Sequence, residues 1–222
     1  MGQARQQVFQ EIVRLTSKVF LAPIVLLSLV GLDTVMHASQ VGLPGLPDFL
    51  SREDCICAGT VYQPGITIFP DLQTSPCPWV RPTPLASGIR FYAGHPLKTA
   101  KDQPIGTLCV LDREARSFSA EEQLVLERLA AVAMRLLDLQ LVLQDHQREE
   151  PAVWRAINNR VALSIQRIET LTALAQWEVS PETEAARAYR TSMHDERILI
   201  TQDIDYEVGA ALARFSTKRM QA

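Results

Sequence analysis

Residues 88–97 read GIRFYAGHPL and residues 104–112 read PIGTLCVLD, and these two stretches decide the fold of the 222-residue chain. The runs Ile89–Leu97 and Ile105–Leu111 within them have the residue types and the length of β-strands. A polar loop, residues 98–104, joins the two runs in the manner of a hairpin. We therefore predict that these strands are antiparallel neighbours.

Three further β-rich runs precede this hairpin, and proline and glycine separate them. They are Ile24–Val30, Thr34–Val41 and Ile66–Phe69. Residues 3–19 carry apolar side chains at spacings of three and four, which predicts an amphipathic helix. The whole pattern predicts an α+β fold, with helices flanking an antiparallel sheet and an all-α helical hairpin after it.

A long helix is predicted after Ser119, because Ser119 and Glu122 have the spacing of a capping box. Apolar residues then recur at alternating spacings of four and three, which is a heptad stripe. The stripe consists of Val125, Leu129, Val132, Leu136, Leu139 and Leu143. A second stripe beside it consists of Leu126, Ala130, Ala133 and Leu137. One stripe can pack on the sheet of its own chain while the other meets a second chain, so we expect a homodimer; packing within one chain is the alternative.

Residues 151–216 are predicted to form a hairpin of two helices. Pro151 suits a first helical turn, and Ser180-Pro181 marks the start of a second helix. Two helices alone bury too little apolar surface to be stable, so a second copy of the hairpin is expected to cover them. Ile157 and Val161 would then join the heptad helix in the dimer interface. We place the domain boundary between residues 149 and 150.

The composition narrows the function classes. The formal net charge is −3 and no basic run is present, so direct nucleic-acid binding is not expected. The most apolar stretch, residues 19–32, is shorter than the roughly 18 residues that a membrane span needs. It also has no features of a signal peptide. We expect a cytoplasmic protein without a membrane partner, whose cysteine thiols are reduced.

The strand hairpin and its neighbours resemble bacterial GAF domains over residues 8–143. Besides residues 88–97 and 104–112, the similar segments are 22–24 (API), 57–58 (CA), 69–72 (FPDL) and 116–119 (RSFS). The resemblance implies a sensory domain with a ligand cavity over one face of the sheet. It does not imply one ligand, because GAF domains bind cyclic nucleotides, tetrapyrroles, haem, amino acids or nothing known.

The resemblance also implies where a cavity would lie. Its roof would be residues 70–88, in which prolines at positions 76, 78, 82 and 84 stiffen the chain. Candidate lining residues are Phe69, Trp79, Phe91 and Cys109, with Asp71, Arg81 or Arg90 as polar anchors. Since Arg90 and Phe91 alternate along a strand, only one of them can face the cavity. The alternative is a cavity filled by its own side chains.

Other chemistries find little support in the sequence. No cysteine neighbours a histidine, as a covalent bilin site would require, and the motif of cyclic-nucleotide-binding relatives is absent. The spacing of Cys55, Cys57 and Cys77 does not suit zinc, so we interpret these thiols as structural and Cys109 as a core residue. No catalytic constellation can be assembled from the histidines, and the segments do not resemble the methionine-sulfoxide reductases of GAF-like fold. The cofactor is unknown, and no catalytic or metal-binding residue is predicted.

Residues 155–163 resemble the phosphoacceptor helix of HWE-type histidine kinases at Asn159, Arg160, Val161 and Leu163. The family's histidine is replaced by Arg155, which cannot accept a phosphoryl group. The resemblance implies a degenerate dimerisation module that has lost phosphotransfer.

Two main functions remain. In the first, a small ligand in the GAF cavity alters the heptad helix, and the hairpin passes the change to a signalling partner. In the second, the cavity is filled and the chain is a dimeric scaffold. A degenerate kinase-like protein in a phosphorelay is the third hypothesis.

Overall fold

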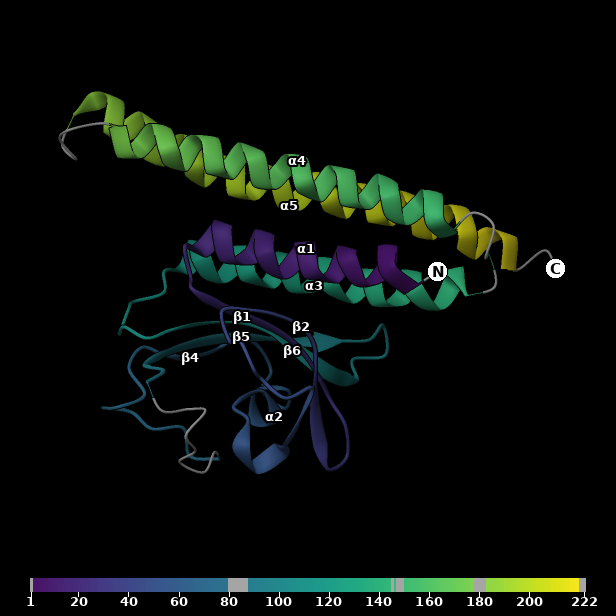
Figure 1. The fold of residues 1–222 in the computed structure, drawn as a ribbon, viewed down its shortest axis with the longest axis horizontal. Coiled ribbons are helices and arrows are strands. Elements are labelled where there is room, and N and C mark those ends of the chain that lie inside the picture. Colours follow the sequence, from purple (N-terminus) through teal and green to yellow (C-terminus); the bar gives the residue numbers. More distant parts are fainter. Residues whose placement is uncertain (1, 80–87, 145, 147–149, 178–182, 220–222) are drawn as a thin grey trace. The chain divides into compact units, whose positions relative to one another are not determined.

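A computed structural model describes residues 2–79, 88–144, 146, 150–177 and 183–219. Its strands form one antiparallel sheet in the order β3-β2-β1-β6-β5-β4 (Figure 1). The strands are β1 (Ile24–Val30), β2 (Thr34–Val41), β3 (Phe49–Ser51), β4 (Thr67–Phe69), β5 (Phe91–Lys98) and β6 (Pro104–Asp112). β1 and β6 pair at the centre, so the first and the last strand of the chain are neighbours.

The predicted α+β fold is confirmed, as is the antiparallel pairing of β5 with β6. Tyr92 lies opposite Leu111 in this pair, and Gly94 lies opposite Cys109. The short strand β3 and the four-residue helix α2 (Cys57–Thr60) were not predicted. Both are too short to show a recognisable period in the sequence.

The chain divides into two compact units. The sheet unit is Ile12–Met134, and the helical unit is Met1–Glu11 with Arg135–Ala222. The predicted boundary at residues 149 and 150 differs from this division, which falls inside α1 (Gly2–Phe20) and α3 (Ala120–Leu143). Each of these helices therefore contributes residues to both units.

Within the sheet unit, α1 and α3 cover one face of the sheet and α2 lies on the other (Figure 1). Successive residues of a strand point to opposite faces. Phe91 of β5 packs against Phe118, with ring centroids 5.6 Å apart, and Phe118 packs against Phe20 at the end of α1. Its neighbour Tyr92 belongs to the core on the α2 face. The sheet thus separates two cores.

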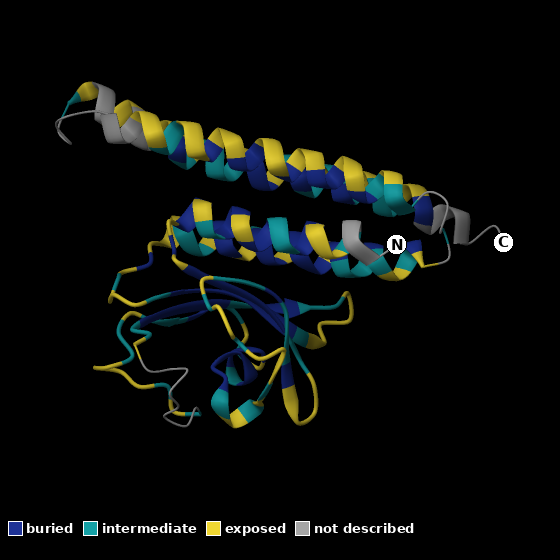
Figure 2. Cartoon of the chain, in the orientation of Figure 1, coloured by how far each residue is buried: buried dark blue, intermediate teal, exposed yellow. Residues whose placement is uncertain are grey.

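In the helical unit, α4 (Glu150–Trp177) and α5 (Glu184–Arg219) form the predicted hairpin. Arg160 lies near Glu207 and Arg167 pairs with Glu196, so the two helices run antiparallel. Their buried residues face inward and their outer faces are exposed (Figure 2). No helix in the described part of the chain has an apolar stretch long enough to cross a membrane.

The eight side chains predicted for the dimer interface are all buried within a single chain. They are Val125, Leu129, Val132, Leu136, Leu139, Leu143, Ile157 and Val161, each at most 2% exposed. A heptad stripe marks an apolar seam without saying which chain fills it. In a single chain the stripe is covered by that chain's own residues, and its place in a dimer interface stays a prediction.

The turn after β2 depends on Gly42, which has a φ of 86°. A Cβ at this position would overlap the backbone carbonyl oxygen of Pro23, whereas a Cβ at Gly45 would meet no atom within 4 Å. Gly45 has a similar φ of 80° and is therefore a matched control. We expect Gly42→Ala to lower the free energy of unfolding by more than ~3 kcal/mol and Gly45→Ala by ~1 kcal/mol. Urea unfolding would measure both, and equal losses would contradict a steric role for Gly42.

Candidate functional site

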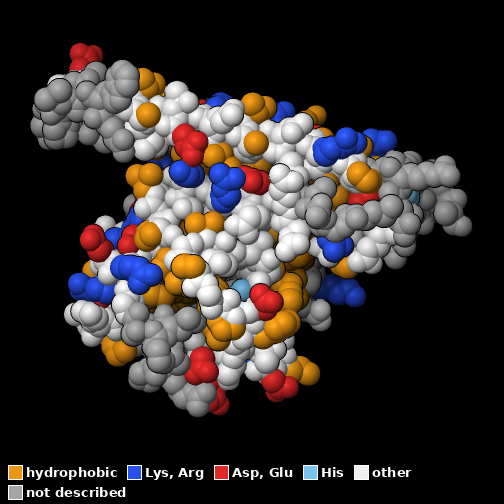
Figure 3. Space-filling view, viewed as in Figure 1, with side chains coloured by type: hydrophobic (Ala, Val, Ile, Leu, Met, Phe, Trp, Pro, Cys, Tyr) orange, Lys and Arg blue, Asp and Glu red, His pale blue; other side chains and the backbone are white. Residues whose placement is uncertain are grey.

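A small cavity lies on the α2 face of the sheet, beneath the segment that links β2 to α2. Figure 3 shows hydrophobic side chains around a hollow on this unit. The cavity volume is about 50 Å³, well below the several hundred Å³ of pockets for organic ligands. In this state it admits only molecules near the size of water. Its lining comprises Leu26, His37, Leu43, Leu46, Leu50, Asp54, Cys55, Ile56, Cys57, Ile89, Tyr92 and Leu111.

His37 is a polar side chain in this mainly aliphatic lining. Its Nδ1 lies 3.1 Å from Ser28 Oγ, while its Nε2 is buried and has no hydrogen-bond partner among the described residues. Burial lowers the pKa of His37, and the charges of Cys57 and Asp48 act in the opposite direction. A buried polar atom without a partner is costly, so a small polar molecule in the cavity would find a favourable contact here.

Two thiols line the cavity, and a third lies next to one of them on the side away from the cavity. Cys57 Sγ lies 3.6 Å from Cys109 Sγ, although the two residues are 52 positions apart in the chain. Cys55 is the nearest cysteine to Cys57 in sequence and lines the cavity with it. All three are buried and none is in a disulfide. We call Cys55, Cys57 and Cys109 the thiol cluster.

The thiols of the cluster differ in acidity because hydrogen bonds and burial act on each of them differently. Hydrogen bonds from Cys109 and Cys55 hold the pKa of Cys57 well below its usual value. The hydrogen bond with Cys57, together with burial, raises the pKa of Cys55. Burial raises the pKa of Cys109. Cys57 is therefore the thiol of the cluster that ionises most readily.

Tyr92 supports the cluster from β5. Its hydroxyl donates to Thr60 Oγ1 over 2.9 Å and lies 3.9 Å from Cys57 Sγ. Thr60 in turn donates to the carbonyl of Ile56, so the hydroxyl chain ties the strand to α2. Burial raises the pKa of Tyr92, which keeps it a neutral donor.

Of the sequence-predicted pocket residues that the structure describes, none lines the cavity. Asp71 and Arg90 form an ion pair with each other, in which Arg90 Nε lies 3.1 Å from Asp71 Oδ1. This contact lowers the pKa of Asp71 and raises that of Arg90. The pair joins the strand start to the segment before it, which is a structural role. Cys109 belongs to the thiol cluster behind the cavity.

Trp79 packs outside the cavity, against α2. Its indole Nε1 donates to the carbonyl of Ile56 over 3.0 Å, and its ring lies 5.8 Å from that of Phe69. A Cβ at Gly59 would overlap the indole, so glycine is needed for this close approach. Trp79 and Phe69 thus form the outer support of α2.

Phe91 lies on the helix-covered face of the sheet against Phe118 and does not line this cavity. The residue of β5 that lines the cavity is its neighbour Tyr92. Arg81 lies outside the described residues. The sequence reading missed the segment 42–47, whose repeated Gly-Leu-Pro places Leu43 and Leu46 over the cavity. Its alternation of apolar and turn-forming residues is the signal that could have revealed a cover.

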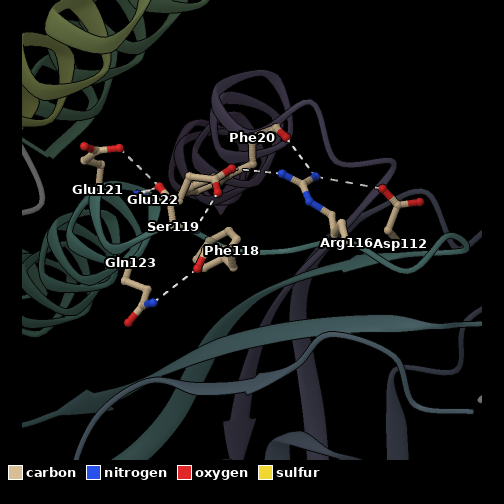
Figure 4. A network of polar contacts seen from close by, with 8 residues as sticks. All are labelled: Phe20, Asp112, Arg116, Phe118, Ser119, Glu121, Glu122 and Gln123. Atoms are coloured by element: carbon tan, nitrogen blue, oxygen red, sulfur yellow. Dashed lines mark hydrogen bonds and ion pairs between the residues drawn. The ribbon is translucent and has the colours of Figure 1, made fainter. Parts of the chain in front are cut away.

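Arg116 connects the cavity-bearing sheet to the helices (Figure 4). Its guanidinium donates to the carbonyl of Phe20 at the end of α1 and to Glu122 in α3, over 3.1 and 2.9 Å. It also lies 3.9 Å from Asp112, the last residue of β6. Glu122 and Ser119 form the predicted capping box, since each accepts a backbone N–H of the other. We call this group the Arg116 junction.

A family model described as the GAF domain matches residues 4–137. The chain belongs to the GAF domain family. The match includes every strand of the sheet, and the family points to a sensory or regulatory role. It does not identify a ligand of this GAF domain.

Relatives support the same assignment. A protein of Pseudomonas aeruginosa strain PAO1 named cyclic di-GMP phosphodiesterase is 31% identical over 181 residues, which is 79% of this chain. The chain spans 30% of the length of that relative. The match covers so much of the chain that it cannot lie within the GAF domain alone. Whichever residue it begins at, it continues past residue 137 and includes most of α4.

Solved structures share the fold of the GAF domain. A free methionine-R-sulfoxide reductase from Thermoplasma acidophilum aligns with a TM-score of 0.50 and 19% identity, covering 60% of this chain and 91% of its own. The GAF domain of an Acinetobacter phosphoenolpyruvate-protein phosphotransferase aligns with a TM-score of 0.51 and 12% identity, covering 64% and 95%. At these identities the likeness concerns the fold alone.

The kinase-like reading of α4 stays a hypothesis. Arg155, which stands at the histidine position of that resemblance, is exposed and donates to the carbonyl of Pro151. The adjacent Trp154 is buried and packs against Phe9 within the helical unit. Among the described residues, no group of three or more metal-ligating side chains is placed to hold an ion.

The neutral state of His37 makes stability depend on pH. Because burial lowers its pKa in the folded state, the unfolded chain binds a proton more readily as the pH falls below about 6.5. The free energy of unfolding should therefore decrease from about pH 7.5 to about pH 5.5. His95 contributes in the same direction, because burial lowers its pKa too. Urea unfolding should show a smaller decrease for His37→Asn than for the wild type; an unchanged slope would contradict the assignment.

Proposed function

We propose that this chain is a regulatory module that binds a small molecule on the α2 face of its GAF domain and relays the change through helices, without catalysis of its own. The Arg116 junction carries this proposal. It joins the end of β6, which lines the cavity through Leu111, to the end of α1 and the start of α3. A displacement of the end of β6 would therefore shift the contacts that Arg116 makes with both helices.

The relay has short physical steps. Leu111 lines the cavity, and the next residue, Asp112, faces the Arg116 guanidinium. Arg116 also lies over the ring of Phe91, 5.3 Å from its centroid, on the helix-covered face. Because Glu122 both caps α3 and accepts from Arg116, a movement of the guanidinium changes the first turn of that helix. α3 then supplies residues to the helical unit.

The curated relative supports a role in signalling. Its similarity to this chain extends beyond the GAF domain into α4, so the two elements occur together in both proteins. We infer that GAF domain and helices act as one regulatory element. The relative's name suggests cyclic di-GMP turnover as the process that a signalling partner of this chain carries out.

The alternative is a ligand-free scaffold, and the small cavity favours it. An organic ligand would require the segment over the cavity, which includes Leu43 and Leu46, to move outward. This segment follows Gly42 and contains Gly45, both at positive φ. The two functions differ in whether any small molecule stabilises the protein.

A stability screen with nucleotides, amino acids and tetrapyrroles tests the proposal. We expect at least one compound to raise the melting temperature of the wild type, because binding to the native state adds to its stability. His37→Gln should weaken the effect by about tenfold in affinity through loss of the Nε2 contact. His95→Gln is the matched control, since His95 is also half-buried but lies outside the cavity lining.

The relay is tested on the same ligand complex by amide hydrogen exchange. Binding should change the exchange of the first turns of α3, and Arg116→Lys should abolish that change while keeping the shift in melting temperature. Lysine keeps the charge but lacks the planar fork that reaches Phe20 and Glu122 together. If no compound stabilises the wild type, the scaffold alternative replaces the sensor. If Arg116→Lys leaves the response of α3 intact, the junction is not the relay.

We further propose a homodimer formed through exposed side chains of the helical unit. Leu163 of α4 is 55% exposed, and Leu199 and Tyr206 of α5 are 46% and 77% exposed. A second copy is the occupant we propose, because a two-fold interface brings the same apolar residues of both chains together.

Light scattering at tens of micromolar should therefore detect a dimer. The double variant Leu163→Glu/Leu199→Glu should shift it to a monomer, because burying the new carboxylates costs several kcal/mol. Leu32→Glu is the control, since Leu32 is 90% exposed in the sheet unit. A monomeric wild type, or a dimer that resists the double variant, would show that this face is not the interface.

A further inference from the structure

The thiol cluster combines proximity with access. Cys57 Sγ and Cys109 Sγ are 3.6 Å apart. A disulfide bond is about 2.05 Å long, so a small approach of the two sulfur atoms would be enough to form one. Cys57 also lines the cavity, while Cys109 does not. A molecule in the cavity would therefore meet Cys57 first, with Cys109 behind it.

The size of the cavity restricts the reagent. About 50 Å³ holds one or two molecules of water size, and hydrogen peroxide is of that size. Disulfides, glutathione and bulky hydroperoxides are too large for this state of the cavity. The lining also contains His37, whose buried Nε2 has no partner among the described residues and could hydrogen-bond to a peroxide oxygen.

We propose that Cys57 and Cys109 form a peroxide-responsive thiol pair, in which Cys57 is oxidised first and Cys109 closes a disulfide with it. This inference rests on the proposed function, because it names the ligand class and the covalent change that the GAF domain would relay. Neither thiol is a surface residue, so the cavity is the route by which the oxidant arrives.

The chemistry balances in two steps. Cys57 sulfur attacks one peroxide oxygen, the O–O bond breaks, and the thiol proton leaves with the other oxygen as water. The product is a sulfenic acid on Cys57. Cys109 sulfur then attacks that sulfur, the S–O bond breaks, and the hydroxyl leaves as water with the Cys109 proton. Two thiols are oxidised to one disulfide, and one hydrogen peroxide is reduced to two waters.

The acidity of the cluster agrees with this order. Only thiolates attack efficiently, and hydrogen bonds from Cys109 and Cys55 lower the pKa of Cys57. Burial raises the pKa of Cys109, so Cys109 reacts with peroxide more slowly than Cys57 does. Its attack follows once Cys57 has become a sulfenic acid next to it. Cys55 donates to Cys57 in the reduced state and does not need to be oxidised.

A Cys57–Cys109 bond would join α2 to the middle of β6. Cys109 is three residues before Asp112, which contacts Arg116. The bond would draw this strand toward α2 and so displace the Arg116 junction. Oxidation would thereby reach the first turn of α3 by the route proposed for a ligand.

The test treats the folded protein with hydrogen peroxide, blocks the remaining thiols, and maps disulfide-linked peptides by mass spectrometry. The wild type should yield a Cys57–Cys109 link. Cumene hydroperoxide should form it about tenfold more slowly or worse, because the cavity excludes it. Cys109→Ser should lose the link and accumulate a sulfenic acid on Cys57 that dimedone traps, and Cys57→Ser should show neither product.

Two further variants act as controls. Cys55→Ser and Cys77→Ser should both retain the link, the first within the cluster and the second in a half-buried thiol outside it. Because the wild-type map needs no variant, misfolding of Cys57→Ser would not obscure the result. A link between Cys55 and Cys57, oxidation confined to Cys77, or equal rates with both peroxides would overturn the inference.

Hydrogen exchange separates this inference from the proposed function. A Cys57–Cys109 link without any change in α3 would leave the thiol pair standing and refute the relay. A compound that stabilises the protein and changes α3, combined with no link under peroxide, would support the relay and refute the thiol pair.

Discussion

The Arg116 guanidinium is the contact on which the arrangement of the GAF domain depends. Its planar fork meets three elements: the end of α1, which is 96 residues away in the sequence, and β6 and α3, which flank Arg116 directly. One N–H satisfies the last carbonyl of α1, another meets the carboxylate that caps α3, and the same group faces the end of β6. Its flat surface covers Phe91, which packs on Phe118 and, through it, on Phe20. The polar contacts of Arg116 and the apolar contacts of these three rings thus hold the same ends of β6, α1 and α3 together.

The Arg116 junction is the place where the two cores on either side of the sheet come nearest to a shared contact. The residues on the α2 face and those under the helices are separated by the strands, so they do not touch directly. The strand end is the shared element, because Leu111 belongs to one core and Asp112 meets the junction. In the proposed relay, the junction is the contact that α1 and α3 both share with the end of β6.

Sequence reasoning predicted the scaffold well, because long periodic segments determine it. The capping box of Ser119 and Glu122 formed as predicted, and β5 and β6 pair in the expected antiparallel direction. The cavity could not be predicted in the same way. Its lining comes from an aperiodic segment with Leu43 and Leu46, and from the four-residue α2, neither of which has a helical or strand period. The proximity of Cys57 and Cys109 is likewise a product of the fold, since 52 residues separate them.

The heptad stripe shows why pattern alone cannot assign a partner. A spacing of four and three tells which side chains share a face, and burial of Leu129 and Leu136 agrees with that. The spacing does not tell what covers the face, because packing against a helix of the same chain and packing against a helix of another chain require the same pattern. In this molecule the chain covers the stripe itself, and exposed side chains such as Leu163 and Tyr206 remain on the other helices. The homodimer proposed for this chain therefore uses apolar side chains that lie outside the stripe and that packing within the chain leaves exposed.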